Sequence, residues 1–365
     1  MNKILIITRE FPPHVIGGAG FHSFFLAKSF LENNIKVTVF SAYNGSKDIT
    51  ETVLVNNNNF DINRITYFNK IIPRIWFNRK IIKILRNIDL TDYDAIISHE
   101  YIDFTKIKFG GKKILKTHIN IFKKSEEYKE KKILHFFMNY FIWPFERSLE
   151  KKSLFSADII IHNSRLTRNL YIQKFPELKK IEQQVVYNGV ESDKFEFCVD
   201  KKKYFLFVGG DSRRKGFNNI LKLAKLLPDD FTIKIAGTMN KKNRNIVNNI
   251  HNIEYIGKIS QSDLIHYYKN ALVLVHPCFY EPFGNVIFEA LACGSLAIIS
   301  NEKYCGAAEI IPNSFSIRVD PYDIKINLDE LKNKLSKINR KELAAFIKQN
   351  SWNLHCNKII NLILK

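Results

Sequence analysis

The sequence predicts an α/β protein that consists of two doubly wound domains. The chain has 365 residues, about twice the length of a typical single domain. Short apolar runs rich in Ile and Val alternate with helical stretches along both halves of the chain. Such continuous apolar runs are typical of parallel strands that helices cover on both faces. Because ligands bind at the carboxyl ends of strands in these sheets, we expect the binding site in the cleft between the two domains.

The positions of the expected strands predict two separate sheets. The polar stretch at 188–203 separates the apolar runs of the first half from those of the second. We therefore expect one domain at 1–190 and another at 200–349, joined by a linker. The expected strands cover 3–8, 35–40, 93–99, 112–118 and 157–164 in the first half, and 204–210, 231–237, 252–257, 271–277 and 295–300 in the second.

The cysteines and the apolar runs restrict the class of protein. The five cysteines show no CxxC spacing, which indicates reduced thiols in a cytosolic protein and no zinc site. The N-terminal apolar run, 4–7, is too short for a signal peptide. No run reaches the roughly 18 apolar residues that a membrane-spanning helix needs. We expect a cytoplasmic protein.

Glycines and cations follow two of the expected strands. Gly17 and Gly18 come after the first strand and precede a helix, so they form either a plain tight turn or a loop that brings backbone amides to a ligand. Arg213, Arg214 and Lys215 come after the strand at 204–208, where they suit a diphosphate or form a solvated basic turn. The sequence has no GxxxxGK[ST] motif, which excludes an ordinary P-loop ATPase.

Two carboxylates lie eight residues apart near the end of the strand at 271–277. Glu281 falls in a turn with Pro and Gly, and Glu289 falls in an apolar helix expected at 285–292. A buried carboxylate needs hydrogen-bond donors, which are either ligand hydroxyls or groups of the protein itself. Eight helical residues span about 12 Å, whereas the two acids of a glycosidase lie about 5–9.5 Å apart. We therefore favour two acids along an extended ligand, with an anion at the helix N-terminus between them.

These motifs resemble those of the retaining GT-B glycosyltransferases of glycosyltransferase family 4. The stretch EPFGNVIFEA (281–290) is similar to the E-x7-E motif of that family, and VGGDSRRKGFNN (208–219) to its phosphate-binding Lys-Gly turn, in a form most like the lipopolysaccharide-core glucosyltransferases. The segments VIGGAG, KTH (116–118), ADIIIHNSRLTRNL and VVYNGVESDKF also match, and SWNLHCNKIINLIL resembles a terminal helix, about 350–365, that returns to the N-terminal domain. One departure is Gly210, where many members have an Arg, so we assign that role to Arg214.

The resemblance implies a GT-B fold with two Rossmann-like domains and assigns a role to each site residue. The N-terminal domain would bind the acceptor and the C-terminal domain the nucleotide sugar. Glu281 and His118 would be the catalytic residues that contact the donor sugar, although a lone His at a strand end is often structural. The expected remaining roles are diphosphate binding by Arg214, Lys215, Phe283 and Gly284, ribose binding by Glu289, and an acceptor-side loop at Gly17 and Gly18.

The resemblance also implies the reaction and its setting. The enzyme would be a hexosyltransferase that moves a sugar from a nucleoside diphosphate sugar, UDP favoured over GDP, to a glycan or lipid-linked acceptor in bacterial cell-surface polysaccharide, lipopolysaccharide or glycolipid synthesis. Cations at the diphosphate would replace a divalent metal. The DYD at 92–94 precedes a strand, so we interpret it as a turn and expect no metal and no cofactor.

The net charge of +20 has two explanations. It either serves an anionic partner or reflects the Lys- and Asn-rich composition that an AT-rich genome produces. Cations alternate with aromatic residues at 69–87 and 131–155, which suits helices on an anionic membrane, although buried helices give a similar pattern. We expect peripheral association with the inner face of the cytoplasmic membrane.

Two other classes of function stay open at this level. The charge alone would also suit a nucleic-acid-binding protein, but the sequence has no zinc-finger spacing, RNP-like motif or helix-turn-helix pattern. We therefore expect no nucleic-acid partner. A phosphorylase or epimerase of GT-B architecture is the second alternative, and the chain is short for such a phosphorylase.

Overall fold

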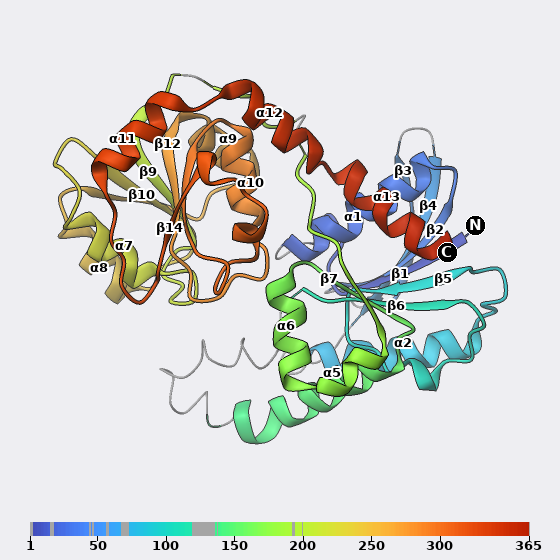
Figure 1. The fold of residues 1–365 in the computed structure, drawn as a ribbon. Helices are drawn as coiled ribbons and strands as arrows, with labels where there is room; N and C mark the ends of the chain where they lie inside the picture. Colours follow the sequence, from blue (N-terminus) through green and yellow to red (C-terminus); the bar gives the residue numbers. More distant parts are fainter. Residues whose placement is uncertain are drawn as a thin grey trace. The chain divides into compact units, whose positions relative to one another are not determined.

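The computed structural model describes residues 3–14, 18–43, 45, 47–55, 58–66, 73–118, 136, 138–191, 194–198 and 200–364. Residue contacts divide the chain into two compact units (Figure 1). Unit 1 comprises Met1–Asn188 and Trp352–Lys365, and unit 2 comprises Gly189–Ser351. The division predicted from the sequence lies at 190–200, and the predicted returning helix begins at about 350.

Unit 1 contains an eight-stranded sheet in the order β3-β4-β2-β1-β5-β6-β7-β8. All pairs are parallel except the antiparallel pair β3–β4. The strands are β1 (Lys3–Thr8), β2 (Lys36–Tyr43), β3 (Ile49–Val55), β4 (Asn58–Thr66), β5 (Ala95–Ser98), β6 (Lys112–Lys116), β7 (Ile159–His162) and β8 (Glu182–Val185). From β1, the next strand in the sequence, β2, lies on one side and the later strand β5 lies on the other, so the sheet has its topological switch point between β1 and β5.

The central strands of unit 1 bury both of their faces, as their apolar runs predicted. Side chains alternate across a strand, so Ile4 and Ile6 of β1 enter one core whereas Leu5 and Ile7 enter the other. Helices α1 (Gly18–Glu32) and α13 (Trp352–Leu364) cover one face. Helices α2 (Pro73–Asn87), α5 (Trp143–Ser156) and α6 (Arg165–Lys174) contribute to the other core, with the short helices η1 (Phe104–Lys106), η3 (Met138–Ile142) and η4 (Pro176–Lys180) on the same stretch of chain.

The C-terminal helix α13 belongs to unit 1 and lies beside α1 (Figure 1). Its apolar residues Cys356, Ile359, Ile360 and Ile363 enter the same core as α1. The Lys112 Nζ of β6 donates to the carbonyl oxygen of Ile363 at 2.9 Å. A cation at the C-terminal carbonyls of a helix is favourable, so this contact fastens the end of α13 to the sheet.

Unit 2 has a six-stranded parallel sheet in the order β11-β10-β9-β12-β13-β14. The strands are β9 (Lys202–Val208), β10 (Thr232–Ala236), β11 (Ile253–Gly257), β12 (Ala271–His276), β13 (Leu296–Ser300) and β14 (Ser316–Val319). The helices are α7 (Phe217–Ala224), α8 (Lys241–Asn248), α9 (Gln261–Asn270), α10 (Asn285–Ala292), α11 (Leu328–Lys337) and α12 (Arg340–Gln349), with η6 (Gly306–Glu309) and η7 (Asn313–Phe315). The order reverses between β9 and β12, the doubly wound arrangement that the sequence predicted.

Four strands that the sequence did not predict lie at or next to a sheet edge. Strands β3, β8 and β14 are edge strands, and β4 is the neighbour of β3. An edge strand is covered less than a central one, so its sequence alternates or is polar, as in EQQV of β8. The continuous apolar runs predicted nine interior strands and one edge strand, β11.

The predicted basic aromatic segments proved only partly exposed. On α2, Arg74 and Phe77 are buried, which corrects the expectation that they belong to a charged surface. Trp143 of α5 is also buried and belongs to the same core as Phe77. The rest of the aromatic segment is different: Phe136, Tyr140, Phe141 and Phe145 are exposed by 58–66%. Lys70 and Phe137 lie outside the described residues. Among the helices of the described residues, none is long and apolar enough to cross a membrane.

Candidate active site

The donor-side residues of the sequence analysis meet at the switch point of unit 2. The turn 209–216 follows β9 and the loop 277–284 follows β12, and these two strands are neighbours in the sheet. The Phe279 N–H donates to the carbonyl oxygen of Arg214 at 2.8 Å, which joins the turn to the loop. Glycines permit the close approach: a Cβ on Gly216 would lie 2.1 Å from the Pro277 oxygen. The sheet thus brings residues about 65 positions apart into one site.

Gly210 explains the departure from the family's pattern. Its φ is +58°, and a Cβ at this position would lie 1.9 Å from the Thr238 carbonyl oxygen. The backbone therefore leaves no room for a side chain here, and an Arg could not be placed without moving the β10–α8 connection. In this chain, a guanidinium reaches the site from Arg214 instead, four residues further along the turn.

Glu281 is held by both its backbone and its side chain. Its N–H donates to the Tyr304 oxygen at 2.7 Å, and its carbonyl oxygen accepts from the Gly306 N–H at 2.9 Å. Its Oε2 lies 3.2 Å from His276 Nε2 and 3.3 Å from Arg214 Nη1. The Arg214 Nη1 also donates to the Tyr280 carbonyl oxygen at 2.7 Å. The carboxylate is therefore oriented before any ligand binds.

The charges around Glu281 keep it ionised. Burial alone would raise the pKa of Glu281, but the Arg214 charge and the His276 hydrogen bond outweigh burial and hold this pKa well below its usual range. Burial lowers the pKa of His276, and the bond to Glu281 opposes that effect only in part. A neutral His276 can donate one hydrogen, and the distance directs it to the Glu281 carboxylate.

Arg214 and Lys215 lie at the strand end as predicted, with one difference. Arg214 is paired with Glu281, so its charge is shared with a carboxylate and is not reserved for a ligand phosphate. Lys215 Nζ makes a long contact of 3.4 Å to the Val208 carbonyl oxygen. Its charge lowers the pKa values of both Glu281 and Glu289. The structure leaves Arg213 exposed.

Glu289 lies on α10, whose bounds match the predicted helix. Burial raises the pKa of Glu289, and a hydrogen bond from the Tyr268 hydroxyl at 2.8 Å opposes this effect. Tyr268 is the protein partner that the sequence analysis left open as an alternative to a ligand. Gly284, with φ of +102°, is the N-cap of α10, and the buried Phe283 ring stacks on Phe288 at 4.8 Å. The N-terminal amides of α10 therefore begin directly beside Glu281.

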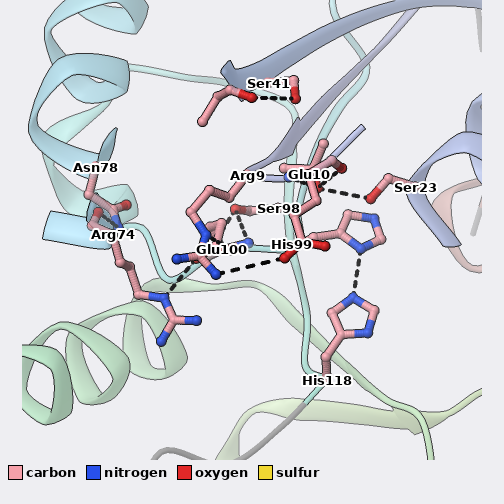
Figure 2. Close-up of polar contacts among 12 residues, drawn as sticks. Arg9, Glu10, Ser23, Ser41, Arg74, Asn78, Ser98, His99, Glu100 and His118 are labelled. Carbon is pink, nitrogen blue, oxygen red and sulfur yellow. Dashed lines mark hydrogen bonds and ion pairs between the residues drawn. The ribbon is translucent and has the colours of Figure 1, made fainter. Parts of the chain in front are cut away.

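A second group of polar residues gathers at the switch point of unit 1. His99 follows β5 and His118 follows β6, and the His99 Nδ1 lies 2.8 Å from the His118 Nε2 (Figure 2). Gly18 is the first residue of α1. Gly17, the other glycine of the predicted acceptor-side loop, lies outside the described residues.

Two more histidines lie behind this pair. The ring of His22, on α1, is centred 4.9 Å from that of His99 and 5.2 Å from that of His118. The His22 Nε2 lies 2.9 Å from the Nε2 of His355 on α13. Burial, together with the charge of the nearby Lys116, lowers the pKa of His118 to about 3. Burial also lowers the pKa values of the other three histidines, and that of Lys116 to about 7.

A buried ion-pair cluster adjoins the histidines. The Glu100 carboxylate accepts from Arg74 Nε at 2.9 Å and lies 3.5 Å from Arg9 Nε, as Figure 2 shows. Arg74 also lies 3.8 Å from Glu146 of α5. This pairing gives the physical reason why Arg74 is buried and not part of the basic surface.

The site residues that were not predicted from the sequence are His276, His99, His22, His355 and Glu100. His99 and His276 each end an apolar strand, and His118 was noticed for that reason. Because the carboxyl ends of parallel strands converge, the same signal could have found all three. His22 and His355 lie within helices and gave no comparable signal.

One group of the described residues has a spacing that a metal could use. His22, His99 and His118 each place one nitrogen within 4.8 Å of the others. Two nitrogens bound to one tetrahedral Zn²⁺ lie roughly 3.3 Å apart. The hydrogen bonds from His22 and His99 to other imidazoles already use one nitrogen of each ring. The expected absence of a metal remains a prediction.

Comparison with known families covers almost the whole chain. The family described as "Glycosyl transferases group 1" matches residues 190–351. The family described as "Glycosyltransferase Family 4" matches residues 16–194. The two matches together follow the division into units 2 and 1.

The relatives that are similar in sequence include two glycosyltransferases. An uncharacterised glycosyltransferase of Methanocaldococcus jannaschii is 22% identical over 342 residues, 85% of this chain and 82% of the relative. An O-antigen chain mannosyltransferase B of Escherichia coli is 26% identical over 173 residues, 43% of this chain and 45% of the relative.

The solved structures that share the fold over nearly the full length include the three that follow. A sucrose-phosphate synthase from Thermosynechococcus elongatus superposes with a TM-score of 0.75 at 18% identity, covering 99% of this chain and 98% of that one. WaaG, a glycosyltransferase involved in lipopolysaccharide biosynthesis, gives 0.63 at 14% identity, covering 97% and 94%. Anabaena HepE in complex with UDP gives 0.67 at 15% identity, covering 100% and 99%.

Proposed function

Because this chain belongs to glycosyltransferase family 4 and has the GT-B fold, we propose that it transfers a hexose from a nucleoside diphosphate sugar to a glycan or lipid-linked acceptor, with retention of the anomeric configuration. The observation that carries this proposal is the cluster at the carboxyl ends of β9 and β12. There, the ionised Glu281, the cations Arg214 and Lys215, and the half-buried Glu289 lie at one switch point.

The order of charges in this cluster fits the parts of a nucleotide sugar. Glu281 accepts hydroxyls of the hexose, and Glu289 accepts hydroxyls of the ribose. Lys215, whose charge acts on both acids, binds the diphosphate between them, together with the amides of Phe283 and Gly284 at the start of α10. Arg214 has two tasks: it orients Glu281 and adds positive charge beside the phosphates.

The proposed chemistry uses these charges in the transition state. As the bond from the hexose to the diphosphate breaks, the sugar becomes oxocarbenium-like and negative charge builds on the departing β-phosphate. Cations fixed at that phosphate stabilise the transition state more than the bound substrate, and this difference accelerates the reaction. The ionised Glu281, near the sugar, stabilises the developing positive charge. His118 of unit 1 donates a hydrogen bond to the donor sugar, and Gly17 and Gly18 serve the acceptor.

We propose that this reaction needs no divalent metal, because Arg214 and Lys215 supply the positive charge that a metal would supply. Exhaustive treatment with EDTA followed by gel filtration should therefore leave the transfer rate intact. Loss of activity that Mg²⁺ or Mn²⁺ restores would contradict this part of the proposal.

The donor is proposed to be a UDP-sugar. HepE, which shares the fold, binds UDP. Calorimetric titration with UDP, GDP, ADP and their common sugars tests the proposal directly. Specific binding of one nucleoside diphosphate to the wild type, lost in Lys215→Ala, would support it. Equal weak binding of all three, or binding of nucleic acid in a salt-dependent gel shift with none of the nucleotides bound, would overturn it.

Retention is tested on the product. Once a donor is identified, the anomeric coupling constant of the new glycosidic bond can be compared with that of the donor sugar by NMR. The same configuration supports a retaining transferase, and an inverted product contradicts it. Release of free sugar at the same rate with and without an acceptor would indicate a hydrolase.

We further propose a bacterial cell-surface polysaccharide, lipopolysaccharide or glycolipid as the product, with the enzyme acting in the cytoplasm at the inner face of the membrane. The O-antigen mannosyltransferase relative and the likeness to WaaG support this setting. A lipid-linked acceptor would bring the reaction to the membrane surface.

Two exposed faces of unit 1 support the membrane contact. Along α2, the exposed side chains repeat every three or four residues, so they share one face that combines an aromatic ring with cations: Trp76, Arg79, Lys83 and Arg86. The second face is aromatic and consists of Phe136, Tyr140, Phe141 and Phe145 around η3 and the start of α5. We call them the basic face and the aromatic face. Cations attract anionic headgroups, and exposed aromatic rings enter the interface.

A further inference from the structure

The proposed catalytic His118 is the half-buried end of a row of four imidazoles, and the other three are buried. The row runs from His355 on α13 to His22 on α1, and then to His99 and His118 after strands β5 and β6. Figure 2 shows the last hydrogen bond of the row, between His99 and His118. A neutral imidazole carries one hydrogen, on either Nδ1 or Nε2, so each hydrogen bond in the row constrains its neighbours.

The tautomers of the first two rings follow from a backbone carbonyl. The His355 Nδ1 is hydrogen bonded to the Tyr187 carbonyl oxygen, which can only accept, so this Nδ1 carries the hydrogen. The His355 Nε2 is then a bare acceptor, and the His22 Nε2, 2.9 Å away, must donate to it. The remaining nitrogen of His22, Nδ1, is a bare lone pair, and within the described part of the chain it is buried without a hydrogen-bond partner.

The unpartnered nitrogen of His99 indicates which ring donates in the His99–His118 hydrogen bond. Among the described residues, the His99 Nε2 is also buried without a partner. If His99 accepted at Nδ1, its hydrogen would be on Nε2 and would form a buried N–H with no acceptor. Buried N–H groups without an acceptor are rarer in proteins than buried acceptors without a donor. The arrangement that avoids such a group has His99 Nδ1–H donating to a bare His118 Nε2.

We infer that His99 is a positioning residue that holds His118 in the tautomer with its hydrogen on Nδ1. This inference rests on the proposed function for its consequence: the free nitrogen of His118 is then a hydrogen-bond donor, which is what an oxygen of the donor sugar requires. In the opposite tautomer, the same nitrogen would be a lone pair facing sugar oxygens. The nearly parallel rings, inclined by 20°, also fix the orientation of the imidazole.

The surroundings keep the imidazoles of His99 and His118 neutral, and the hydrogen bond between them requires this state. The charged groups that act on them are Lys116, at the end of β6, and Glu100, next to His99. Burial and the Lys116 charge lower the pKa of His118 to about 3, and Glu100 opposes them only in part. A protonated His118 would carry hydrogens on both nitrogens and could no longer accept from His99.

The hydrogen positions can be measured without any substrate. In the full-length protein with ¹⁵N-labelled histidine, NMR separates protonated from bare imidazole nitrogens, and a His118→Gln variant identifies the His118 signals among those of the ten histidines. The inference expects His118 with a protonated Nδ1 and a bare Nε2 at neutral pH. A protonated Nε2 with a bare Nδ1 would overturn it. This measurement stands even if the protein transfers no sugar, so it separates a failure here from a failure of the proposed function.

Two variants of His99 separate hydrogen bonding from packing. His99→Phe keeps the ring volume against His22 and His118 but removes both nitrogens. His99→Asn loses volume but keeps an N–H donor near the position of Nδ1. We expect His99→Phe to lower kcat about tenfold, the effect of one lost hydrogen bond in the transition state, while His99→Asn retains most of the rate. Both should bind the free nucleoside diphosphate as the wild type does, because that site is assigned to unit 2.

Two other outcomes for the rates of the His99 variants would contradict the inference. If His99→Phe is as active as the wild type, or if His99→Asn is at least as impaired as His99→Phe, the residue acts through packing alone. A thermal melt of each variant checks that it is folded. Should His99→Phe fail to fold, the NMR spectrum of the wild type and the rate of His99→Asn still decide, since an inactive but folded His99→Asn would overturn the inference.

Discussion

Arg214 Nη1 and Glu281 Oε2 lie 3.3 Å apart, although Arg214 follows β9 and Glu281 follows β12. The pair connects the two loops of the switch point and leaves Glu281 ionised, because the cation outweighs the effect of burial on the carboxyl pKa. The two cations of the site therefore differ in their contacts with the protein. Arg214 forms an ion pair with Glu281, whereas Lys215 makes a long contact of 3.4 Å to the Val208 carbonyl oxygen.

The two acids of the site should fail differently when neutralised. Glu289→Gln should weaken binding of the free nucleoside diphosphate by about 10- to 150-fold, because charged hydrogen bonds to the ribose, worth about 1.5–3 kcal/mol, are lost. Glu281→Gln should leave this binding intact or slightly tighter, since Arg214 loses its carboxylate partner, but should depress sugar transfer. Calorimetry with the nucleotide and steady-state kinetics give the two measurements. Equal loss of nucleotide affinity in both variants would refute the division of roles.

Lys215→Ala should reduce donor binding and turnover together. A charged hydrogen bond to phosphate contributes about 1.5–3 kcal/mol, so kcat/KM for the donor should fall by about 10- to 150-fold. The matched control is Lys222→Ala, which removes an exposed lysine from α7 in the same unit. The assignment fails if Lys215→Ala keeps the wild-type kcat/KM, or if Lys222→Ala loses as much.

Two left-handed glycines of unit 2 test the steric reason for the missing arginine. Gly210 has φ of +58°, and a Cβ added there would lie 1.9 Å from the Thr238 oxygen, whereas Gly257 has φ of +83° and a Cβ there would meet nothing within 4 Å. Alanine at either site costs about 1–2 kcal/mol for the left-handed backbone. Gly210→Ala should lower the free energy of unfolding by a further 1–3 kcal/mol or so, as overpacking does. Urea unfolding of both variants measures the difference, and equal losses would mean that the Thr238 contact is not the constraint.

Much of this architecture follows from the sequence, and the reasons differ between its parts. Strands such as β1 and β12 are buried on both faces, so their runs are uniformly apolar and could be recognised. The Pro and Gly of the 281–284 turn fixed the start of α10. The pair Arg214–Glu281 could not be predicted, because it depends on which strands are neighbours in the sheet. The row of histidines brings together α1, α13 and two strand ends, and no local pattern in the sequence carries that information.

The buried Lys116 should make unit 1 more stable as the pH rises. Burial lowers its pKa in the folded chain to about 7, whereas an unfolded lysine has a pKa of about 10.4. Between these values the unfolded chain binds one more proton than the folded chain, so the free energy of unfolding rises by about 1.4 kcal/mol per pH unit. His118, with a pKa of about 3 against about 6.5 when unfolded, acts in the same direction at lower pH.

Replacing Lys116 measures its contribution to the pH dependence of the free energy of unfolding. Urea unfolding of Lys116→Met between pH 7 and 10 should show a flatter rise than the wild type, while the slope between pH 4 and 6 stays unchanged. Lys108→Met, at an exposed position of the same unit, should keep the slope of the wild type throughout. An unaltered slope in Lys116→Met between pH 7 and 10 would show that Lys116 is not the titrating group.

The basic and aromatic faces of unit 1 should bind vesicles through different forces. Neutralising Arg79 and Lys83 should weaken partitioning onto anionic vesicles by about 30-fold, since each cation near the surface contributes about 1 kcal/mol. We leave Lys80 unchanged because its Nζ lies 2.6 Å from Asp48, so its charge is already paired. Replacing Phe141 and Phe145 by Ser should also release the protein, but this loss should persist at high salt, where the charge contribution is screened.

The control for the basic face is a pair of exposed lysines on unit 2. Lys241 and Lys242 open α8, and their neutralisation removes the same net charge from a surface that we do not assign to the membrane. Sedimentation with vesicles of anionic and of neutral lipid compares the variants. If the double change on α8 releases the protein as much as the change at Arg79 and Lys83, attraction by net charge explains the binding and the basic face has no special role. If the wild type does not sediment with anionic vesicles at all, the membrane proposal fails, and the charge of +20 is explained by composition.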